Sequence, residues 1–273
     1  MSIERATISD REWALICPEL PLLPHVKIGN LDKCRKFIGA VLWLLRGGIE
    51  WRMLPPEYGK WNSVFKRYSR WCSHGAWEIL LAKFSQQADL QDVSIDGTVN
   101  RAHACSAGYQ KDSAEQEALG RSKGGFSCKV HAICDAHGLP LNFILTGGQS
   151  AECKQAIPLL ENISTEAVLA DKAYDTNEFR DWLKSNKIKA VIPPKSNRKE
   201  GIFCDYWHYK ERHAVECMFG KLKYYRRIST RYEKKAINYM GMLCLASVFL
   251  WLRSSVFPLK DTIAKKLKQY ALL

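Results

Sequence analysis

Three acidic residues are best placed to do chemistry in this chain of 273 residues, because each falls in a different predicted element. Asp96 lies midway along an alternating stretch, "DVSIDGTV", on the face opposite Val93 and Ile95. Asp171 lies where a later apolar strand ends, and Glu216 lies in a helix-length segment. If the three converge, they form a site of hard oxygen ligands, which suits Mg²⁺ or Mn²⁺. Two such ions about 4 Å apart would serve an in-line phosphoryl displacement, by activating a water or a 3′-hydroxyl and by stabilising the leaving oxygen.

Glu216 stands in a strongly basic stretch, "YKERHAVECMFGKLKYYRRISTRYEK". On one continuous helix, four polar residues of this stretch would project within roughly 60° of one another. They are Tyr209, Arg212, Glu216 and Lys223. An apolar core face would not have this composition. Two interpretations stay open from the residues alone, a metal site beside a polyanion and a salt-bridged surface stripe.

The net charge of +13 is concentrated in the last third of the chain. Residues 187–273 hold 19 Lys and Arg against 6 Asp and Glu, whereas residues 91–186 hold 9 against 13. A basic third indicates nucleic acid or an anionic membrane surface as partner. The segment 224–235 would bind DNA backbone phosphates, with its tyrosines as stacking surfaces, and a solvated basic tail is the alternative. The predicted phosphate ligands of this segment are Arg226, Arg227, Arg231 and Lys234.

The first 88 residues predict a small all-helical unit. Ser9 and Glu12 form a capping-box pattern at its first helix, and Gly47 with Gly48 closes a longer helix. In "NSVFKRYSRWCSHG", apolar residues recur at helical spacing and three cations fall on the opposite side. These cations predict DNA contact through a helix-turn-helix, although an ordinary solvated basic face explains them equally well. They are Lys66, Arg67 and Arg70.

After residue 90 the hydrophobic period changes from helical to alternating. Three stretches predict a meander of strands, at 92–99, 126–135 and 137–148. Further elements are predicted as a helix at 150–163, a strand at 166–175, a helix at 177–188, a strand at 189–194 and a helix at 207–223. This order predicts one α/β domain with a mixed sheet.

Cysteine usage and hydropathy favour a cytoplasmic protein, and its expected binding to DNA would associate it with the nucleoid. The ten cysteines are scattered without a CxxC pair, which favours reduced buried thiols over disulfides or zinc. The N-terminus carries no signal-peptide hydrophobic region. One apolar run, 236–252, is shorter than the roughly 20 residues of a spanning helix, so it predicts a buried helix.

Several stretches together resemble bacterial insertion-sequence DDE transposases of the group related to insertion sequences four and five. The third-acid region of that group carries Tyr-x2-Arg-x3-Glu-x6-Lys, which is matched by the four polar residues from Tyr209 to Lys223. The similarity runs over nearly the whole chain, in the expected order. The other matching stretches are "GGIEWRMLPPEYGKWNSVFKRYSRW", "SIDGTVNRAH", "GRSKGGFSCKVHA", "LADKAYD", "IPPKSNRK" and "RRISTRYEK".

The resemblance implies an RNase H-like mixed-sheet catalytic domain at 89–273 with basic C-terminal helices, and a helical DNA-binding domain at 1–88. It implies that Asp96, Asp171 and Glu216 are the catalytic acids and hold two Mg²⁺ or Mn²⁺ ions. The group's second acid is the first Asp of an Asp-Lys-x-Tyr-Asp pattern, hence Asp171. Asp175 is the rival, with capping of the next helix as its alternative role.

The implied activity is that of a DNA transposase. Metal-dependent cleavage would free a 3′-hydroxyl at each element end, and this hydroxyl would attack target DNA. Tyr209, Arg212 and Lys223 would hold the scissile strand, while the N-terminal helices would recognise the terminal inverted repeats. A homodimer or larger assembly on double-stranded DNA is expected, because two ends must meet. Two alternatives remain, a related metal-dependent nuclease without joining activity and a non-catalytic DNA-binding descendant, although the presence of all three acids argues against the second.

Three further side chains have both a functional and a structural interpretation. Lys129 and His131 lie on the predicted strand next to that of Asp96, where they would contact phosphate or form a salt bridge and a packed histidine. His103 is either an acid–base or metal group or, as we favour, a structural residue.

Overall fold

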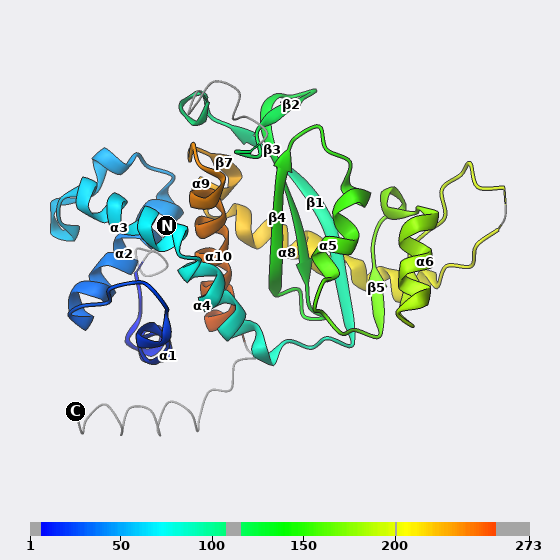
Figure 1. The fold of residues 1–273 in the computed structure, drawn as a ribbon, viewed down its shortest axis with the longest axis horizontal. Helices are drawn as coiled ribbons and strands as arrows, with labels where there is room; N and C mark the ends of the chain where they lie inside the picture. Colours follow the sequence, from blue (N-terminus) through cyan, green and yellow to red (C-terminus); the bar gives the residue numbers. More distant parts are fainter. Residues whose placement is uncertain (1–6, 108–115, 200, 255–273) are drawn as a thin grey trace. The chain divides into compact units, whose positions relative to one another are not determined.

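A computed structural model describes residues 7–107, 116–199 and 201–254 of the chain. The contacts within it divide the chain into two units (Figure 1). Unit 1 holds the residues up to Gln87 together with those from Tyr224 onwards, and unit 2 holds Ala88–Lys223.

Unit 1 is built from helices drawn from both ends of the chain. Its longer N-terminal elements are α1 (Asp10–Ile16), α2 (Leu31–Gly47), α3 (Trp61–Ser73) and α4 (Ala76–Phe84). Its later elements are α9 (Arg226–Ser229), the two-residue strand β7 (Thr230–Arg231) and α10 (Ala236–Arg253). In Figure 1 the orange helix α10 lies beside the blue and cyan helices, and it packs on α3 and α4.

Local sequence signals set the helix ends of unit 1. The Ser9 hydroxyl accepts a hydrogen bond from the Glu12 amide, and the Glu12 carboxylate accepts one from the Ser9 amide, so the predicted capping box forms. Gly48 ends α2 with φ 71°, a left-handed conformation that favours glycine. A Cβ on Gly48 would also lie 2.6 Å from the Cβ of Arg226. Glycine is therefore required there by both conformation and space.

Helix α10 is the core helix of unit 1. Its length and composition would allow it to cross a membrane, but 72% of its apolar 18-residue window is buried inside the protein. Gly241 permits close packing, because a Cβ there would come within 2.6–2.9 Å of the side chains of Cys72, Trp77 and Tyr68. The Tyr68 hydroxyl donates to the Asn238 carbonyl at 2.5 Å. The predicted buried helix is thus confirmed.

The burial of α10 changes the division of the chain that the sequence predicted. The sequence predicted that the basic C-terminal helices belong to the domain that begins at residue 89, whereas the structure groups residues 224–254 with the N-terminal helices. The physical reason is that α10 is apolar on nearly every side, so it needs a helical layer around it.

Unit 2 contains a mixed sheet with strand order β2-β3-β1-β5-β6, and β4 also pairs with β3. The pairs β1/β3, β2/β3 and β3/β4 are antiparallel, while β5 runs parallel to both β1 and β6. The five predicted strands of this unit form in the predicted order, and the short strands β2 and β7 were not predicted. The strands are β1 (Asp92–Ala102), β2 (Gly120–Ser122), β3 (Gly125–Cys134), β4 (Pro140–Gly147), β5 (Ala167–Leu169) and β6 (Lys189–Val191).

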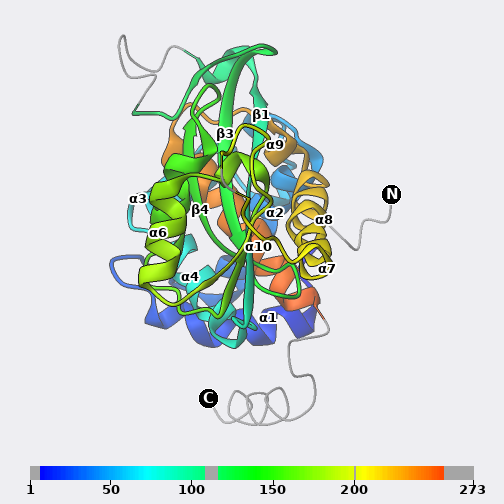
Figure 2. The same cartoon turned by 90° about the vertical axis from the view of Figure 1, so that its right-hand side faces the viewer.

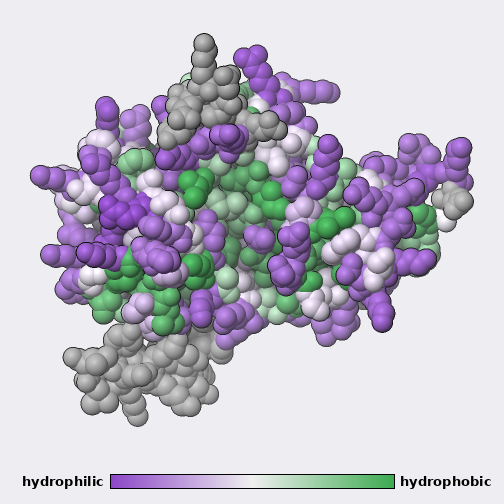
Figure 3. Space-filling model, viewed as in Figure 1, coloured by the Kyte–Doolittle hydropathy of each residue, from purple (hydrophilic) through white to green (hydrophobic). Residues whose placement is uncertain are grey.

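Helices cover both faces of this sheet (Figure 2). On one face α5 (Ala156–Leu160) and α6 (Asn177–Ser185) bury an apolar core that includes Val93, Ile95 and Ile133. On the other face α8 (His213–Lys223) packs on β1 and β3. The outer side of α6 is hydrophilic, as the surface in Figure 3 shows.

Two predicted helices of unit 2 are shorter than expected. The segment 207–223 is interrupted, with α7 (Tyr206–Tyr209) and a 3-10 turn at Lys210–Arg212 preceding α8. The helix predicted at 150–163 is reduced to α5 after a 3-10 turn at Glu152–Gln155. Pro158 explains the second difference, because proline has no amide hydrogen to donate to the carbonyl four residues earlier.

All ten cysteines are free, and seven of them are buried. The prediction of buried core cysteines therefore holds for these seven.

Candidate active site

Arg212 joins two of the three predicted acids. One of its guanidinium nitrogens, Nη1, donates to Asp96 Oδ2 at 3.2 Å, and the other, Nη2, donates to Glu216 Oε1. Its guanidinium carbon lies 5.6 Å from the centre of the Tyr209 ring. The Arg212 side chain is only 16% exposed. The middle of β1 and the start of α8 thus meet around one cation that is mostly shielded from solvent.

Lys223 completes the contact between α8 and β1. Its ammonium group donates to Thr98 Oγ1 at 2.7 Å. Thr98 lies two residues beyond Asp96, and therefore on the same face of the strand. The predicted stripe of Tyr209, Arg212, Glu216 and Lys223 consequently faces the acid-bearing side of β1, despite the 3-10 turn that interrupts the helix.

Asp171 follows the strand next to β1. Strands β1 and β5 are parallel, with Ser94 opposite Leu169, where β5 ends. Asp171 comes two residues later, close enough for its charge to raise the pKa of Asp96. The Asp171 carboxylate accepts a hydrogen bond of 2.7 Å from the Ala173 amide, which caps the 3-10 turn that follows.

The environment of Asp96 opposes its negative charge. Burial is the main cause that raises its pKa to about 6, and the charges of Glu152 and Asp171 act in the same direction. The Gly97 amide and Arg212 lower it, but they compensate only in part. A carboxylate in this environment gains from an additional nearby cation.

The donor chemistry of the three acids fits a hard divalent cation, since it consists of carboxylate oxygens alone. Within the described residues, however, no group of three or more His, Cys, Asp or Glu side chains stands in metal-binding geometry. Arg212 already contacts Asp96 and Glu216, so a metal ion would compete with its guanidinium for their oxygens.

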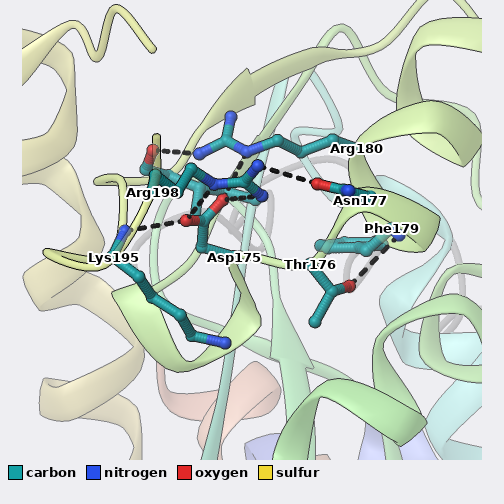
Figure 4. A network of polar contacts seen from close by, with 8 residues as sticks. Asp175, Thr176, Asn177, Phe179, Arg180, Lys195 and Arg198 are labelled. Carbon is teal, nitrogen blue, oxygen red and sulfur yellow. Dashed lines mark hydrogen bonds and ion pairs between the residues drawn. The ribbon is translucent and has the colours of Figure 1, made fainter. Parts of the chain in front are cut away.

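Asp175, the rival acid, is part of a buried ion-pair network (Figure 4). Its side chain is fully buried and accepts four hydrogen bonds, two of them from Arg198 and one each from Arg180 and the Lys195 amide. Helix α6 is capped instead by Thr176, whose hydroxyl accepts from the Phe179 amide. The alternative role assigned to Asp175, as a helix cap, is therefore wrong. Its role here is to hold the loop after β6 to α6.

Lys129, His131 and His103, each of which could have a functional or a structural role, make structural contacts. Lys129 forms a 3.2 Å ion pair with Glu152 and donates to the Ser150 carbonyl at 2.7 Å. His131 is fully buried, with Nε2 at 2.8 Å from Thr146 Oγ1, and burial lowers its pKa to about 4. His103 caps a 3-10 turn by accepting from the Cys105 amide.

Two of the predicted phosphate ligands in the segment 224–235 are buried, which corrects the prediction for them. Arg227 pairs with the buried Glu233 and also donates to the Ile49 carbonyl. Arg231 has no exposed surface and donates to the backbone carbonyls of Glu233 and Lys234. These guanidinium groups hold unit 1 together and do not reach its surface.

The remaining side chains of this segment divide by exposure. Arg226 and Lys234 are exposed, as expected of phosphate ligands. Tyr224 is 71% exposed, whereas Tyr225 is buried against Arg46 and cannot serve as a stacking surface.

Helix α3 also presents fewer cations than predicted. Lys66 and Arg70 are exposed. Arg67 instead stacks on the rings of Phe37 and Trp71 and donates to the Ile28 carbonyl at 2.9 Å. Arg67 is thus a packing residue, and the prediction that it faces outward is wrong.

Glu152 and Tyr174 are two further polar side chains near β1 that were not selected from the sequence. A Cβ on Gly97 would come within 2.9 Å of Glu152 Cγ, so Glu152 lies against the strand that carries Asp96. The Tyr174 hydroxyl is buried without a hydrogen-bond partner. The available signals were an acid just after β4 and the tyrosine of the Asp-Lys-x-Tyr-Asp pattern.

The chain matches known transposases in sequence. Residues 8–81 match the family described as "Putative transposase of IS4/5 family", and residues 87–202 and 168–253 match two families described as "Transposase DDE domain". A relative from Brucella ovis, the putative transposase for insertion sequence element IS6501, is 43% identical over 127 residues, which are 46% of this chain and 98% of the relative. The transposase for insertion sequence element IS1106 of Neisseria meningitidis serogroup B is 29% identical over 168 residues, 58% of this chain and 54% of that protein.

The fold is also similar to that of a solved transposase structure. The piggyBac transposase in its synaptic complex with hairpin DNA matches with a TM-score of 0.52 at 11% identity, over 97% of this chain and 77% of that chain. The expected fold, an RNase H-like mixed-sheet core with a helical N-terminal region, is confirmed. The chain therefore belongs to the IS4/5-related insertion-sequence transposases and carries their DDE transposase domain.

Proposed function

We propose that this protein binds the terminal inverted repeats of an insertion sequence, cleaves the DNA at the element ends and joins the freed ends to target DNA. Its DDE domain belongs to a class of enzymes that cleave DNA and transfer nucleotidyl groups. The observation that carries the proposal is the contact of Arg212 with both Asp96 and Glu216. Asp96 and Glu216 come from distant parts of the chain and lie beside the cations Arg212 and Lys223. The last third of the chain is also strongly basic.

In this proposal Asp96, Asp171 and Glu216 hold Mg²⁺ or Mn²⁺, as two ions. When bound, the metal supplies activation of a water or a 3′-hydroxyl and stabilisation of the leaving oxygen. The raised pKa of Asp96 supports this assignment, since a buried carboxylate near other carboxylates favours a bound cation.

Tyr209, Arg212 and Lys223 contact the scissile strand. Arg212 has a planar fork of donors that matches a phosphate as well as it matches a carboxylate. A phosphate that takes over this fork would leave Asp96 and Glu216 free to bind cations. Lys223 adds a positive charge at Thr98, two residues along the strand from Asp96.

Sequence-independent binding falls to exposed cations of unit 1. Lys66 and Arg70 on α3, with Arg226 and Lys234, are available to neutralise backbone phosphates. We assign recognition of the terminal repeats to the N-terminal helices, and we expect a dimer or larger assembly on double-stranded DNA, in the cytoplasm at the nucleoid.

A strand-transfer assay separates this function from that of a nuclease without joining activity. The full chain is incubated with Mg²⁺, a labelled pre-cleaved element end and a target plasmid. We expect the wild type to join the end to the plasmid, and Asp96→Asn, Asp171→Asn and Glu216→Gln to lose joining while keeping DNA affinity. Asp181→Asn, an exposed acid on α6, is the matched control. Cleavage of uncut ends without joining would favour the nuclease, and full joining by any of the three variants would exclude that residue as a catalytic acid.

A further inference from the structure

His208, in the single turn of α7, bridges two charged side chains of the sheet. Its Nε2 lies 2.7 Å from Asp92 Oδ2, and its Nδ1 lies 3.3 Å from the ammonium nitrogen of Lys189. A lysine ammonium can only donate hydrogen bonds, so Nδ1 accepts from it and Nε2 carries the hydrogen that is donated to Asp92. These contacts therefore select the neutral imidazole with its hydrogen on Nε2.

The register of the sheet explains how two distant side chains share one imidazole. Asp92 of β1 pairs with Ala167 of β5, and Ala167 pairs with Lys189 of β6. The three residues form one row across parallel strands, with their side chains on the same face. The small side chain of Ala167 leaves room between the two longer ones, so the His208 ring can reach both ends of the row.

The candidate site continues along the same face of the sheet. Tyr209 packs on an apolar cluster that includes the two apolar residues of the next row. Asp96, two residues further along β1, accepts a hydrogen bond from Arg212. His208, Tyr209 and Arg212 thus contact successive rows of the sheet in the order in which they occur in the chain, and Figure 2 shows α7 and α8 on the same side of the sheet. The middle row consists of Ser94, Leu169 and Val191.

Helix α7 depends on contacts with the sheet for its position. It is one turn of four residues followed by a 3-10 turn, and a helix of this length is not stable by itself. Asp205 caps it by accepting from the His208 amide at 3.0 Å and also accepts from Lys189 at 2.9 Å. Lys189 is 53% exposed, and exposed ion pairs contribute little. The His208 side chain is only 18% exposed, so its bond to Asp92 is the better shielded link between α7 and the sheet.

We propose that His208 sets the register of α7 and the following 3-10 turn against β1, and thereby positions Tyr209 and Arg212 at Asp96. This explains how the stripe from Tyr209 to Lys223 stays aligned although a 3-10 turn interrupts the helix. His208 is a positioning residue, because its ring contacts β1 four residues before Asp96 and acts through Arg212. The inference rests on the proposed function, which assigns Tyr209 and Arg212 to the scissile strand.

The first test is hydrogen exchange of the metal-free full chain, followed by mass spectrometry, which requires no catalytic activity. His208→Leu removes both hydrogen bonds of the ring and keeps a side chain of similar size. We expect the amides of residues 206–212 to exchange about 10-fold faster, the factor that corresponds to the loss of one hydrogen bond to a charged group. His208→Gln, which carries an N–H near the position of Nε2, should restore most of the protection. His137→Leu removes a histidine on another part of unit 2, 3.9 Å from Asp89, and should leave these amides unchanged.

The second test is the single-turnover rate constant for joining a pre-cleaved end to target DNA with Mg²⁺. At saturating DNA, His208→Leu should lower this rate constant about 10-fold, because Arg212 is no longer held in the productive geometry. The DNA concentration at half-saturation should change by less than about twofold, since many other phosphate contacts supply the affinity. His208→Gln should recover most of the rate, and His137→Leu should join as the wild type does. A purely stabilising role would lower the melting temperature and leave the rate constant of the folded protein unchanged.

The outcomes separate this inference from the proposed function. Wild-type exchange of residues 206–212 in His208→Leu would overturn the inference. Faster exchange with an unchanged rate constant would overturn it as well, because His208 would then only stabilise α7. If the wild type joins no ends, or if Asp171→Asn joins them at the full rate, the proposed function is wrong, and the exchange experiment still decides whether His208 sets the register of α7.

Discussion

Replacement of Asp175 by alanine should destabilise the fold strongly, because this carboxylate is the centre of a buried network. Both of its oxygens accept two hydrogen bonds, at distances of 2.6–2.8 Å, and the side chain has no solvent exposure. Truncation leaves the guanidinium groups of Arg180 and Arg198 without their shared counter-ion. Breaking a buried ion pair by removing one partner costs about 3–5 kcal/mol.

A cost of this size is measurable by scanning calorimetry in metal-free buffer. For a chain of this length, each kcal/mol shifts the melting temperature by roughly 2–4 °C, so Asp175→Ala should unfold at least about 6 °C below the wild type. Asp171→Ala loses only the single hydrogen bond from the Ala173 amide, worth about 1 kcal/mol. The two acids, four residues apart, should therefore differ clearly in their effect on stability.

The pH dependence gives a second check on the same network. Burial alone would raise the pKa of Asp175, but hydrogen bonds from Arg198, the Lys195 amide and Arg180 outweigh it and lower the pKa. A carboxylate with a lowered folded-state pKa contributes stability above its unfolded pKa of about 3.9. This contribution is lost as the pH falls through the folded pKa, so the difference between wild type and Asp175→Ala should begin to shrink only below about pH 4. A difference in melting temperature under about 3 °C at pH 7 would refute the assignment of Asp175 as a structural anchor.

Other predictions concern the histidine on β3 and the arginines. His131 has its pKa lowered to about 4 by burial and by Lys129, so its neutral form contributes stability above about pH 6.5 that is lost as the pH falls towards 4. In urea titrations, the unfolding free energy of the wild type minus that of His131→Gln should fall by roughly 2 kcal/mol between pH 7 and pH 5; a constant difference would contradict the assignment. Arg226→Ala should leave stability unchanged and lower the salt dependence of DNA binding by about one phosphate contact, whereas Arg227→Ala should destabilise the protein by about 3 kcal/mol or more. If Arg226→Ala lowers the melting temperature while Arg227→Ala changes only the salt dependence of DNA binding, the exposures of these two arginines are misassigned. Arg212→Met should raise Mn²⁺ affinity in the absence of DNA and weaken DNA binding, because it removes a competitor for Asp96 and Glu216; weaker Mn²⁺ binding would argue against that competition.

Much of the sheet and of the acid site was predictable from the sequence, because both depend on short-range patterns. Alternation identified β1, β3 and β4, and Asp171 was correctly placed after the end of an apolar strand, which is β5, the parallel neighbour of β1. The stripe from Tyr209 to Lys223 was found from helical geometry and faces β1, even though a 3-10 turn breaks the helix.

The errors concern burial, which residue types do not determine. Arg227 and Arg231 have the composition of phosphate ligands, but a buried glutamate and backbone carbonyls bind them inside unit 1. Arg67 falls on the polar side of its helix and yet stacks on aromatic rings from two helices. Long side chains of this kind reach across an element boundary, and only the tertiary packing shows what they contact.

The position of Glu152 could not be predicted from the sequence either. It depends on Gly97, 55 residues earlier, which has no side chain and so leaves space against β1. No local pattern connects these two positions, because pairing of β1 with β3 and of β3 with β4 is what brings them together.

The most direct measurement of the central claim is a crystal structure of the full chain grown with Mn²⁺ and DNA containing an element end, with the metal located by its anomalous scattering. The account predicts Mn²⁺ bound to carboxylate oxygens of Asp96, Asp171 and Glu216, with the Arg212 guanidinium moved onto a phosphate. Arg212 still bridging Asp96 and Glu216 beside bound DNA, with Mn²⁺ absent from all three acids, would contradict it.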